Sequence, residues 1–385
     1  MGSDHSKRSR LDKLIAVAAV AATTASVATP ANASPGEGAA AIKLADHDKG
    51  RTLSGQGVRV LANAPASKQA QTLTLPIVDV SPVAPASAKS NGALSFKRGK
   101  KSVALANVHF DLANGTLAGT LGKEEIAVFK LGAAPGVNGA TGAVSLAGGK
   151  LRLTSEAAKA LKEDLGLSRA LRHNGVGMIW LNAQAKPTHA AAQKVVSGSV
   201  NWGVLASWRK YVSTDSPAPG PPDTGTITVS EGATANGELS VPNSYFGFPV
   251  TGGTFQKGLY GASDKLALQT QGAVKFAKPV HCIDEVLFSG INLTIDGSAA
   301  GISLNAKNEL GKPSGMTCLT NPAVSTPDVA FATLGSVTPT QSGNTVTWVE
   351  VPSALTAAGS TAWGVGPPYI PGKALDAVTI TVNVG

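Results

Sequence analysis

Apolar and polar residues alternate along most of the chain with a period of two, which is typical of strands with one buried face. Glycine, proline and asparagine separate the alternating segments, and the 44 glycines and 23 prolines favour many tight turns. The sequence therefore predicts a mainly β protein. The predicted strands are Leu73–Val80, Ala93–Phe96, Ser102–Leu112, Gly115–Leu121, Gly225–Val229, Gly237–Val241, Lys265–Leu268, Gly272–Phe276, Gly290–Asp296, Gly301–Asn305 and Val378–Gly385.

One segment of the first half departs from this pattern and is predicted to be a helix. Thr154 is an acceptable N-cap, Glu156 lies in the first turn, and Gly166 ends the segment. The apolar residues that share one face are Ala158, Leu161 and Leu165. We expect this helix to pack over a sheet.

Aromatic residues gather in a second exceptional segment, Trp202–Tyr211. It holds two of the five tryptophans and one of the four tyrosines of the chain. If the segment is helical from about Gly203, then Ser207 and Tyr211 lie four residues apart on one face. This face belongs either to an ordinary core or to a ligand pocket. The loop that follows, Ser213–Thr224, is either a flexible excursion or a lid.

The two halves of the chain resemble each other. Residues Gly92–Phe96 match Gly272–Phe276, and each match is followed by another strand and an Asx-Gly turn. A shorter similarity relates Leu153–Ala158 to Leu355–Gly359. An internal duplication therefore predicts two related β-rich, sandwich-like domains with a few short helices. The predicted domains are residues 41–195 and residues 196–385.

The candidate chemistry is not duplicated with the sheet. His281 stands five residues after Phe276, whereas Lys101 stands five residues after Phe96. No segment at the start of the first half resembles Trp202–Tyr211. We therefore predict that the first domain is degenerate and that any site lies in the second.

The first 33 residues have the organisation of a secretory signal peptide. A basic head precedes the apolar run Leu14–Ala22, and Ala31–Ala33 forms a small-x-small signal that predicts cleavage after Ala33. The apolar run is too short to span a membrane, and no later run of about 18 apolar residues replaces it. Residues 34–40 are predicted to be a linker. We expect a secreted protein, extracellular or associated with the cell envelope, with no transmembrane segment in the mature chain.

The net charge of the chain is +9, and +7 remains without the predicted signal peptide. This charge is spread thinly, without the clustered lysine and arginine stripe of a nucleic-acid-binding protein, so no nucleic-acid partner is expected. A modest positive field favours anionic partners such as acidic polymers or carboxylated small ligands. An ordinary solvated surface also accounts for it.

Cys282 and Cys318 are the two cysteines of the chain. In an exported protein an isolated pair is expected to form a disulfide. The sequence holds no CxxCH motif, which excludes c-type covalent attachment of haem, and neither CxxC nor HExxH supports a zinc site.

Tyr211 and His281 carry the most informative candidate chemistry. Tyrosine can hold haem iron, and a ferric ion prefers the deprotonated phenolate. A phenol with the ordinary pKa of about 10 needs a hydrogen-bond partner or a nearby positive charge to lose its proton at neutral pH. The candidates for this assistance are His281, Arg209 and Lys210. Both residues also have a structural interpretation, in which Tyr211 is an amphipathic core residue and His281 is part of the fold beside Cys282.

The segment Trp202–Val204, followed by Ser207–Arg209 and Tyr211-Val212, resembles the opening of the HtaA domain of actinobacterial haem-uptake proteins. The resemblance covers about residues 198–384. The other matching motifs are Phe246–Phe248, Gly272–Phe276, His281, Asn292–Gly297, Leu355-Thr356, Tyr369–Gly372 and Leu375–Thr379.

This resemblance implies a β-rich fold that holds its ligand between strands and a short helix. It implies a secreted protein that binds ferric haem non-covalently and is not an enzyme, with other haem-uptake proteins of the envelope as partners. Tyr211 would be the axial iron ligand, Ser207 a polar contact to the haem, and His281 a hydrogen-bond partner of the tyrosine oxygen. In many relatives the histidine follows the phenylalanine more closely, whereas Ala277–Val280 intervene here.

Two other functions are compatible with the sequence. A β module of the same shape could act structurally or in adhesion without a ligand, because the first half lacks the site residues. An exported hydrolase is the third reading, and Asp284-Glu285 is the only acidic pair near His281. Adjacent residues diverge on a strand, however, and the chain has no GxSxG motif.

Overall fold

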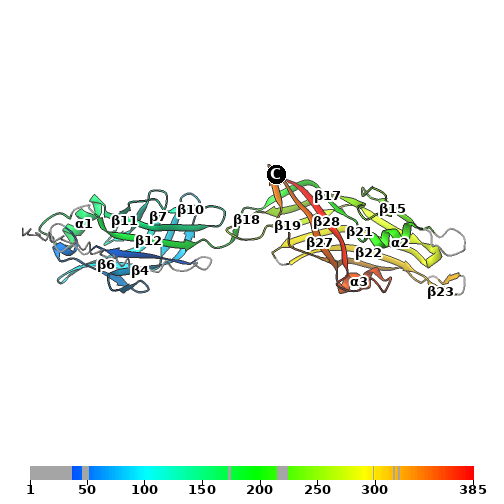
Figure 1. The fold of residues 1–385 in the computed structure, drawn as a ribbon, viewed down its shortest axis with the longest axis horizontal. Helices are drawn as coiled ribbons and strands as arrows, with labels where there is room; N and C mark the ends of the chain where they lie inside the picture. Colours follow the sequence, from blue (N-terminus) through cyan, green and yellow to red (C-terminus); the bar gives the residue numbers. More distant parts are fainter. Residues whose placement is uncertain are drawn as a thin grey trace, which may run out of the picture.

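The computed structural model describes residues 37–45, 52–171, 175–214, 224–297, 299–314, 317–319 and 321–385. The predicted signal peptide and most of the predicted loop Ser213–Thr224 lie outside these residues. Figure 1 shows two elongated halves arranged end to end. The predicted boundary between domains at residue 195 falls within a strand, and the first strand begins at Gly38, inside the predicted linker.

In the described residues, the first half forms one antiparallel sheet of 12 strands. The order along the sheet is β2-β6-β7-β5-β4-β1-β12-β11-β9-β8, with β3 beside β4 and β10 beside β11, and β7 also pairs with β8. The strands are β1 (Gly38–Leu44), β2 (Arg59–Asn63), β3 (Ser67–Gln69), β4 (Thr72–Ser81), β5 (Ser87–Ser90), β6 (Ala93–Arg98), β7 (Lys101–Asp111), β8 (Thr116–Leu121), β9 (Glu124–Leu131), β10 (Gly136–Asn138), β11 (Ala143–Leu153) and β12 (Gly175–Gln184).

The described part of the second half forms another antiparallel sheet of 12 strands. Its order is β15-β20-β21-β19-β17-β14-β28-β27-β25-β22, with β16 beside β17, β26 beside β27, and a further pairing of β21 with β22. The strands are β14 (Gln193–Trp202), β15 (Thr226–Ser230), β16 (Thr234–Asn236), β17 (Tyr245–Gln256), β19 (Lys265–Thr270), β20 (Ala273–Lys278), β21 (Ile283–Asp296), β22 (Ala299–Leu310), β25 (Val324–Leu334), β26 (Thr340–Ser342), β27 (Thr345–Leu355) and β28 (Ala374–Val384). A separate two-stranded hairpin joins β23 (Lys312–Ser314) to β24 (Thr317–Leu319).

The two sheets repeat the same path strand by strand. We match the 12 strands of the first sheet, in chain order from β1, with the 12 strands of the second sheet, in chain order from β14. The two strand orders then coincide, including the side pairings. The matched motifs Gly92–Phe96 and Gly272–Phe276 consequently lie at the same place, on β6 and β20. The prediction of a mainly β protein is confirmed, and the matching strand orders agree with two related β-rich halves.

One predicted strand is wrong. Residues Gly237–Val241 form turns, and the short strand nearby is β16, which ends at Asn236. Gly237 has a φ of 81°, in the left-handed region, and the N–H of Val241 donates to the carbonyl of Glu238 at 3.0 Å. A left-handed residue followed by a local hydrogen bond turns the chain away from the sheet.

Helix α1 (Ser155–Leu165) confirms the predicted helix of the first half. The side chain of Thr154 accepts the N–H of Ala157 as N-cap, and Gly166 ends the helix in the left-handed conformation. Helix α3 (Ala357–Trp363) occupies the corresponding place in the second half. Its N-cap, Thr356, accepts the N–H of Gly359 in the same way.

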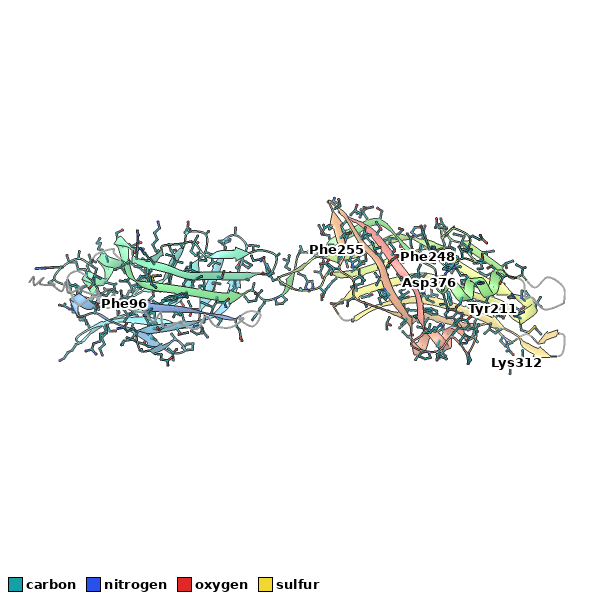
Figure 2. All side chains as sticks on the ribbon, viewed as in Figure 1. Phe96, Tyr211, Phe248, Phe255, Lys312 and Asp376 are labelled. Carbon is teal, nitrogen blue, oxygen red and sulfur yellow. A yellow bond between two sulfur atoms is a disulfide. The ribbon has the colours of Figure 1, made fainter. Side chains whose placement is uncertain are left out.

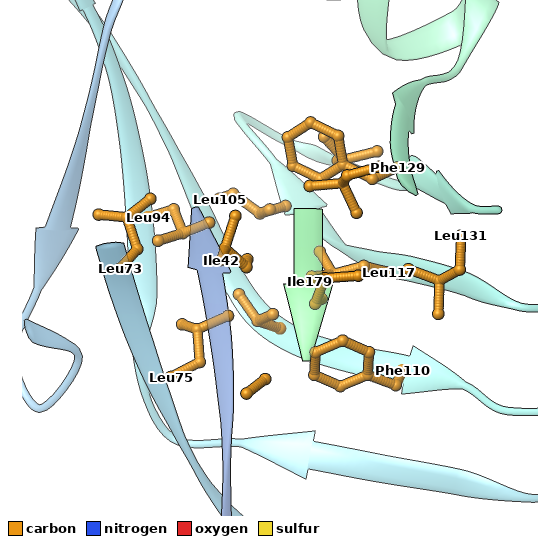
Figure 3. Packing of buried hydrophobic residues seen from close by; sticks show 14 of the residues in the cluster. Ile42, Leu73, Leu75, Leu94, Leu105, Phe110, Leu117, Phe129, Leu131 and Ile179 are labelled. Carbon is orange, nitrogen blue, oxygen red and sulfur yellow. The ribbon is translucent and has the colours of Figure 1, made fainter. Parts of the chain in front are cut away.

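Each half has its own hydrophobic core. The first core is mainly aliphatic, and Figure 3 shows Ile42 and Ile179 among leucines and phenylalanines from neighbouring strands. The second is rich in aromatic rings, with Trp202, Phe246 and Phe276 fully buried. Among the described residues, no helix is both long and apolar enough to cross a membrane.

The halves also contact each other where they meet. Strand β13 (Thr188–His189) pairs with β18 (Gly258–Leu259), and Tyr260 packs into the core of the first half. His189 Nε2 lies 3.0 Å from the carbonyl oxygen of Ser263. These contacts lie at the end of the second half that is opposite to Tyr211 (Figures 1 and 2).

Candidate functional site

Helix α2 (Ala206–Ser213) lies between β14 and β15, and Asp376 holds its first turn. The Oδ1 atom of Asp376 accepts the backbone N–H of Ala206 at 2.9 Å. The N–H of Asp376 in turn donates to the carbonyl of Val204 at 3.0 Å, where Val204 has a φ of 63°. A carboxylate at this position pairs with an N–H group that has no partner inside the helix. The left-handed turn and Asp376 together set where the helix begins.

Arg209 is fully buried and forms an ion pair with Asp376. Its guanidinium also donates to backbone carbonyls, those of Gly203, Leu239, Val241 and Pro242. A Cβ on Gly203 would collide with the Arg209–Asp376 pair, which explains a glycine after Trp202. Arg209, one of the candidates for assisting Tyr211, thus directs its guanidinium to Asp376 and these carbonyls, because residues two apart on a helix point to different faces.

Lys278 closes the other end of α2. This buried lysine, the last residue of β20, donates to the carbonyls of Tyr211 at 2.8 Å and Thr214 at 2.9 Å. Its Nζ atom also lies 5.0 Å from the centre of the Tyr211 ring. Lys278 was not among the residues predicted from the sequence, although alternation from the buried Phe276 places it on the same inward face. The positive charge beside Tyr211 therefore comes from β20, while Lys210 is exposed.

Tyr211 and His281 meet although 70 residues separate them in the chain. The Tyr211 hydroxyl lies 2.5 Å from His281 Nδ1, and the two ring centres are 5.4 Å apart. Tyr211 is 38% exposed, and His281 is exposed as well. Ser207 is also exposed, one helical turn before Tyr211 on the same face. Tyr211 lies toward the outer end of the second half (Figure 2), where His281 contacts it and Ser207 shares its helix face.

The turn that carries His281 is fixed from several directions. His281 ends the short 3-10 helix η2 (Pro279–His281), and Cys282 follows with a φ of 59°. The N–H of Cys282 donates to the carbonyl of Pro279 at 2.8 Å, and its own carbonyl accepts the N–H of Gly311 at 2.7 Å. The predicted disulfide joins Cys282 to Cys318. This framework restricts the positions that the imidazole can reach.

Aromatic rings pack against the buried side of Tyr211. Trp208 stacks on Tyr211 with ring centres 5.7 Å apart, and its edge contacts involve Trp363 at 5.7 Å and Tyr369 at 5.5 Å. Burial, followed by the negative charge that Tyr211 carries when ionised, raises the pKa of Tyr369 to about 12. Tyr369 therefore stays a neutral phenol at neutral pH. The site is therefore apolar on the buried side of Tyr211 and polar at the Tyr211 hydroxyl and the His281 imidazole.

Comparison with known proteins identifies the half of the chain that carries this geometry. The model of the Htaa family matches residues 197–381. Residues 197–381 form an HtaA domain. No curated protein matches the chain.

Solved structures similar to the chain come from Corynebacterium glutamicum. The haem-binding protein HtaB shares 20% identity over 52% of this chain and 97% of that chain, with a TM-score of 0.38. The N-terminal domain of HtaA shares 20% identity over 50% of this chain and 98% of that domain, with a TM-score of 0.37. The C-terminal domain of HtaA shares 16% identity over 50% of this chain and 99% of that domain, with a TM-score of 0.34.

The donor groups of the HtaA domain decide which kind of metal site it could form. Among the described residues, no group of three or more His, Cys, Asp or Glu side chains is arranged to hold a bare metal ion. A single accessible phenol beside an imidazole and above aromatic rings instead suits a flat, apolar cofactor that already holds its metal. The buried Nε1 atoms of Trp208 and Trp363 have no hydrogen-bond partner in the part of the chain that the structure describes.

Proposed function

We propose that the HtaA domain binds ferric haem non-covalently, with the Tyr211 oxygen as axial ligand. The observation that carries this proposal is the 2.5 Å contact between the Tyr211 hydroxyl and His281 Nδ1 on an accessible face. A phenol needs a partner that accepts or shares its proton before it can act as a phenolate ligand. His281 is placed at the oxygen that needs this partner.

Each residue of the site would contribute to haem binding in a different way. When bound, haem supplies a ferric iron that accepts an anionic oxygen ligand. His281 hydrogen-bonds the ligand oxygen, and the buried ammonium of Lys278 places a positive charge beside the ring. Ser207 offers a hydroxyl on the same face. Tyr369 is partly buried and offers apolar surface that can contact a porphyrin, while the buried Trp208 stacks against Tyr211 and holds its ring in place.

The biological setting follows from the predicted export of the chain. A secreted protein that binds haem with an exposed ligand can capture it outside the cell or pass it on. We therefore propose haem uptake or transfer at the cell envelope, together with other haem-uptake proteins. The second candidate is a ligand-free structural or adhesive module, which the first half supports because it repeats the same sheet without a tyrosine.

Titration of the purified chain with haemin tests the proposal, with the Soret absorption as the measurement. Tyr211→Phe removes only the hydroxyl, and we expect it to weaken binding by more than about 100-fold, beyond the usual loss for a residue that supports a ligand. His281→Ala should weaken binding by about 10–100-fold and shift the spectrum. The matched control is Tyr245→Phe, because Tyr245 is 37% exposed on the same half.

Each outcome has a defined meaning. If Tyr211→Phe binds haemin with the affinity and spectrum of the unaltered chain, Tyr211 is not the ligand, even though haem binds. If the unaltered chain gives no sharpened Soret band, the ligand-free module is the better description. Equal losses in Tyr211→Phe and Tyr245→Phe would point to general damage to the domain.

A further inference from the structure

A cluster of cations lies at the far end of the first half, on the hairpin that joins β6 to β7. Four of the five residues from 97 to 101 are lysine or arginine, and Arg59 of β2 lies directly opposite Lys97. We call this set the basic tip. Its members are Arg59, Lys97, Arg98, Lys100 and Lys101. The charge that was expected to be spread thinly is thus locally concentrated.

Among the described residues, the charges of the basic tip have no carboxylate partner. None of its five residues forms an ion pair with any carboxylate in the described part of the chain, including Glu163 and Asp164 on the last turn of α1. Arg98 donates to the carbonyls of Gln56 at 3.1 Å and Gly166 at 2.7 Å, which leaves its charge uncompensated.

The cations also face one another across the strands. Arg59 pairs in register with Lys97, and Arg98 pairs with Lys101. Like charges directly opposite on a sheet repel each other and destabilise it. A hairpin selected only for stability would not place four cations in two facing pairs. An external polyanion would relieve this repulsion.

The duplicated fold shows that this corner of the sheet is available for function. In the second half, Lys278 at the end of β20 and His281 in the connection after it form part of the candidate haem site. In the first half, the connection after β6 is a tight turn at Gly99, which has a φ of 56°. The corner thus offers an exposed cluster of positive charge at a hairpin turn.

We propose that the basic tip is an electrostatic docking surface for an anionic phospholipid membrane. Lys97, Lys100 and Lys101 are exposed, and the tip has no exposed apolar residue to insert, which fits adsorption to a flat charged surface. The proposal does not depend on haem binding.

The position of the tip would also orient the molecule. Figure 2 shows Phe96, the residue before Lys97, toward the outer end of the first half and Tyr211 toward the opposite end of the second. Arg98 contacts Gly166 at the end of α1, and α1 lies at the outer end of the first half in Figure 1. A molecule adsorbed through the basic tip would therefore present the Tyr211 face away from the membrane.

Vesicle binding tests the proposal, using the chain without the predicted signal peptide so that its basic and apolar residues cannot supply the binding. The probes are vesicles of mixed phosphatidylglycerol and phosphatidylcholine, and vesicles of phosphatidylcholine alone. Each cation near an anionic surface contributes about fivefold to binding, so the triple substitution Lys97→Gln, Lys100→Gln and Lys101→Gln should weaken binding to the mixed vesicles by about 100-fold. Added salt should weaken the binding of the unaltered chain.

A charge-matched variant separates the tip from the overall charge. Its substitutions are Lys130→Gln, Lys186→Gln and Lys194→Gln, three exposed lysines that form no salt bridge among the described residues. We expect this variant to bind the mixed vesicles nearly as well as the unaltered chain. Equal losses in both variants, or no preference for anionic vesicles at low salt, would overturn the proposal. Binding to soluble polyphosphate but not to the vesicles would overturn it in favour of a soluble polyanion.

Discussion

The two halves of this protein share a strand order and differ at one corner of the sheet. In the second half, α2 and the turn at His281 place a phenol beside an imidazole. In the first half, a 3-10 helix, η1 (Ser54–Gln56), lies between β1 and β2, and a cationic hairpin replaces the histidine turn. The same sheet therefore supports two different surface chemistries. The fold positions the corner, and a few residues decide what the corner can bind.

The corner of the second half requires a buried charge that the first half lacks. Trp202 ends β14 opposite Val378, just as Leu44 ends β1 opposite Gly177. Asp376 lies two residues before Val378 on β28, and Gly175 lies two residues before Gly177 on β12. The two residues therefore occupy equivalent positions in the two halves. Without a carboxylate there, the first half cannot hold the first turn of a helix such as α2 in the same way.

The largest expected change in stability comes from breaking the Arg209–Asp376 pair. Arg209→Met leaves Asp376 without its cation and removes the hydrogen bonds to the surrounding carbonyls. We expect the free energy of unfolding to fall by about 3–5 kcal/mol, the usual result of removing one partner of a buried pair. Urea unfolding followed by tryptophan fluorescence measures this, because four of the five tryptophans lie in the second half.

Lys210→Met is the control for this substitution, since Lys210 is the neighbouring cation on α2 and is exposed. It should change the free energy of unfolding very little. A similar loss in both variants would show that the helix is sensitive to any substitution, and the contrast drawn at Asp376 would fail.

A smaller effect is expected from the disulfide, which the first half also lacks because both cysteines lie in the second. Cys282→Ser with Cys318→Ser should lower the free energy of unfolding by about 2–4 kcal/mol, because the bond restricts the unfolded chain. It should also weaken haemin binding, since the bond anchors the turn that carries His281. The mass of the unaltered chain should rise by two hydrogen atoms on reduction, and free thiols in the protein purified without reductant would contradict the pairing.

The sheet was largely predictable because local alternation and turn residues specify strands. The prediction for β4, Leu73–Val80, lies within the observed strand, and the Asx-Gly turns have left-handed glycines at Gly115 and Gly297. Threonine caps likewise predicted α1, and the similarity around Thr356 has its counterpart in α3. Strands, turns and helix caps depend on residues that are close together in the sequence, so a single sequence is enough to predict them.

The candidate site was only partly predictable because its contacts cross the fold. Ser207 and Tyr211 follow from helical spacing, but the approach of His281 across 70 residues came from family resemblance. Arg209 was a candidate for assisting Tyr211, but its ion-pair partner Asp376 lies 167 residues away and could not be predicted from local pattern. Lys278 was missed for the same reason. Pairings between distant strands decide which charges meet, and local patterns do not contain that information.

The smallest expected effect concerns Glu285, a further difference between the halves. Glu285 contacts Lys275 at 2.8 Å and Lys307 at 2.6 Å, whereas the register of the first half puts Ser95 and Ser102 at the places of Lys275 and Glu285. Hydrogen bonding to Lys275, and then to Lys307, holds the pKa of Glu285 below its ordinary value of 4.5. Because both lysines are more than a third exposed, solvent screens the interaction, and Glu285→Gln should cost at most about 1 kcal/mol at neutral pH.

The pH dependence of this loss tests its electrostatic origin. A carboxylate whose pKa is lowered by folding stabilises the native state above its ordinary pKa, and the contribution disappears as the pH falls through the folded value. The difference in urea midpoint between the unaltered chain and Glu285→Gln should therefore shrink when the pH is lowered below 4.5. Glu350→Gln is the control, because Glu350 is exposed in the same half and forms no ion pair in the described residues. A difference that stays constant with pH would mean that Glu285 acts through packing, and the charge contrast between the halves would then be confined to Asp376 and the basic tip.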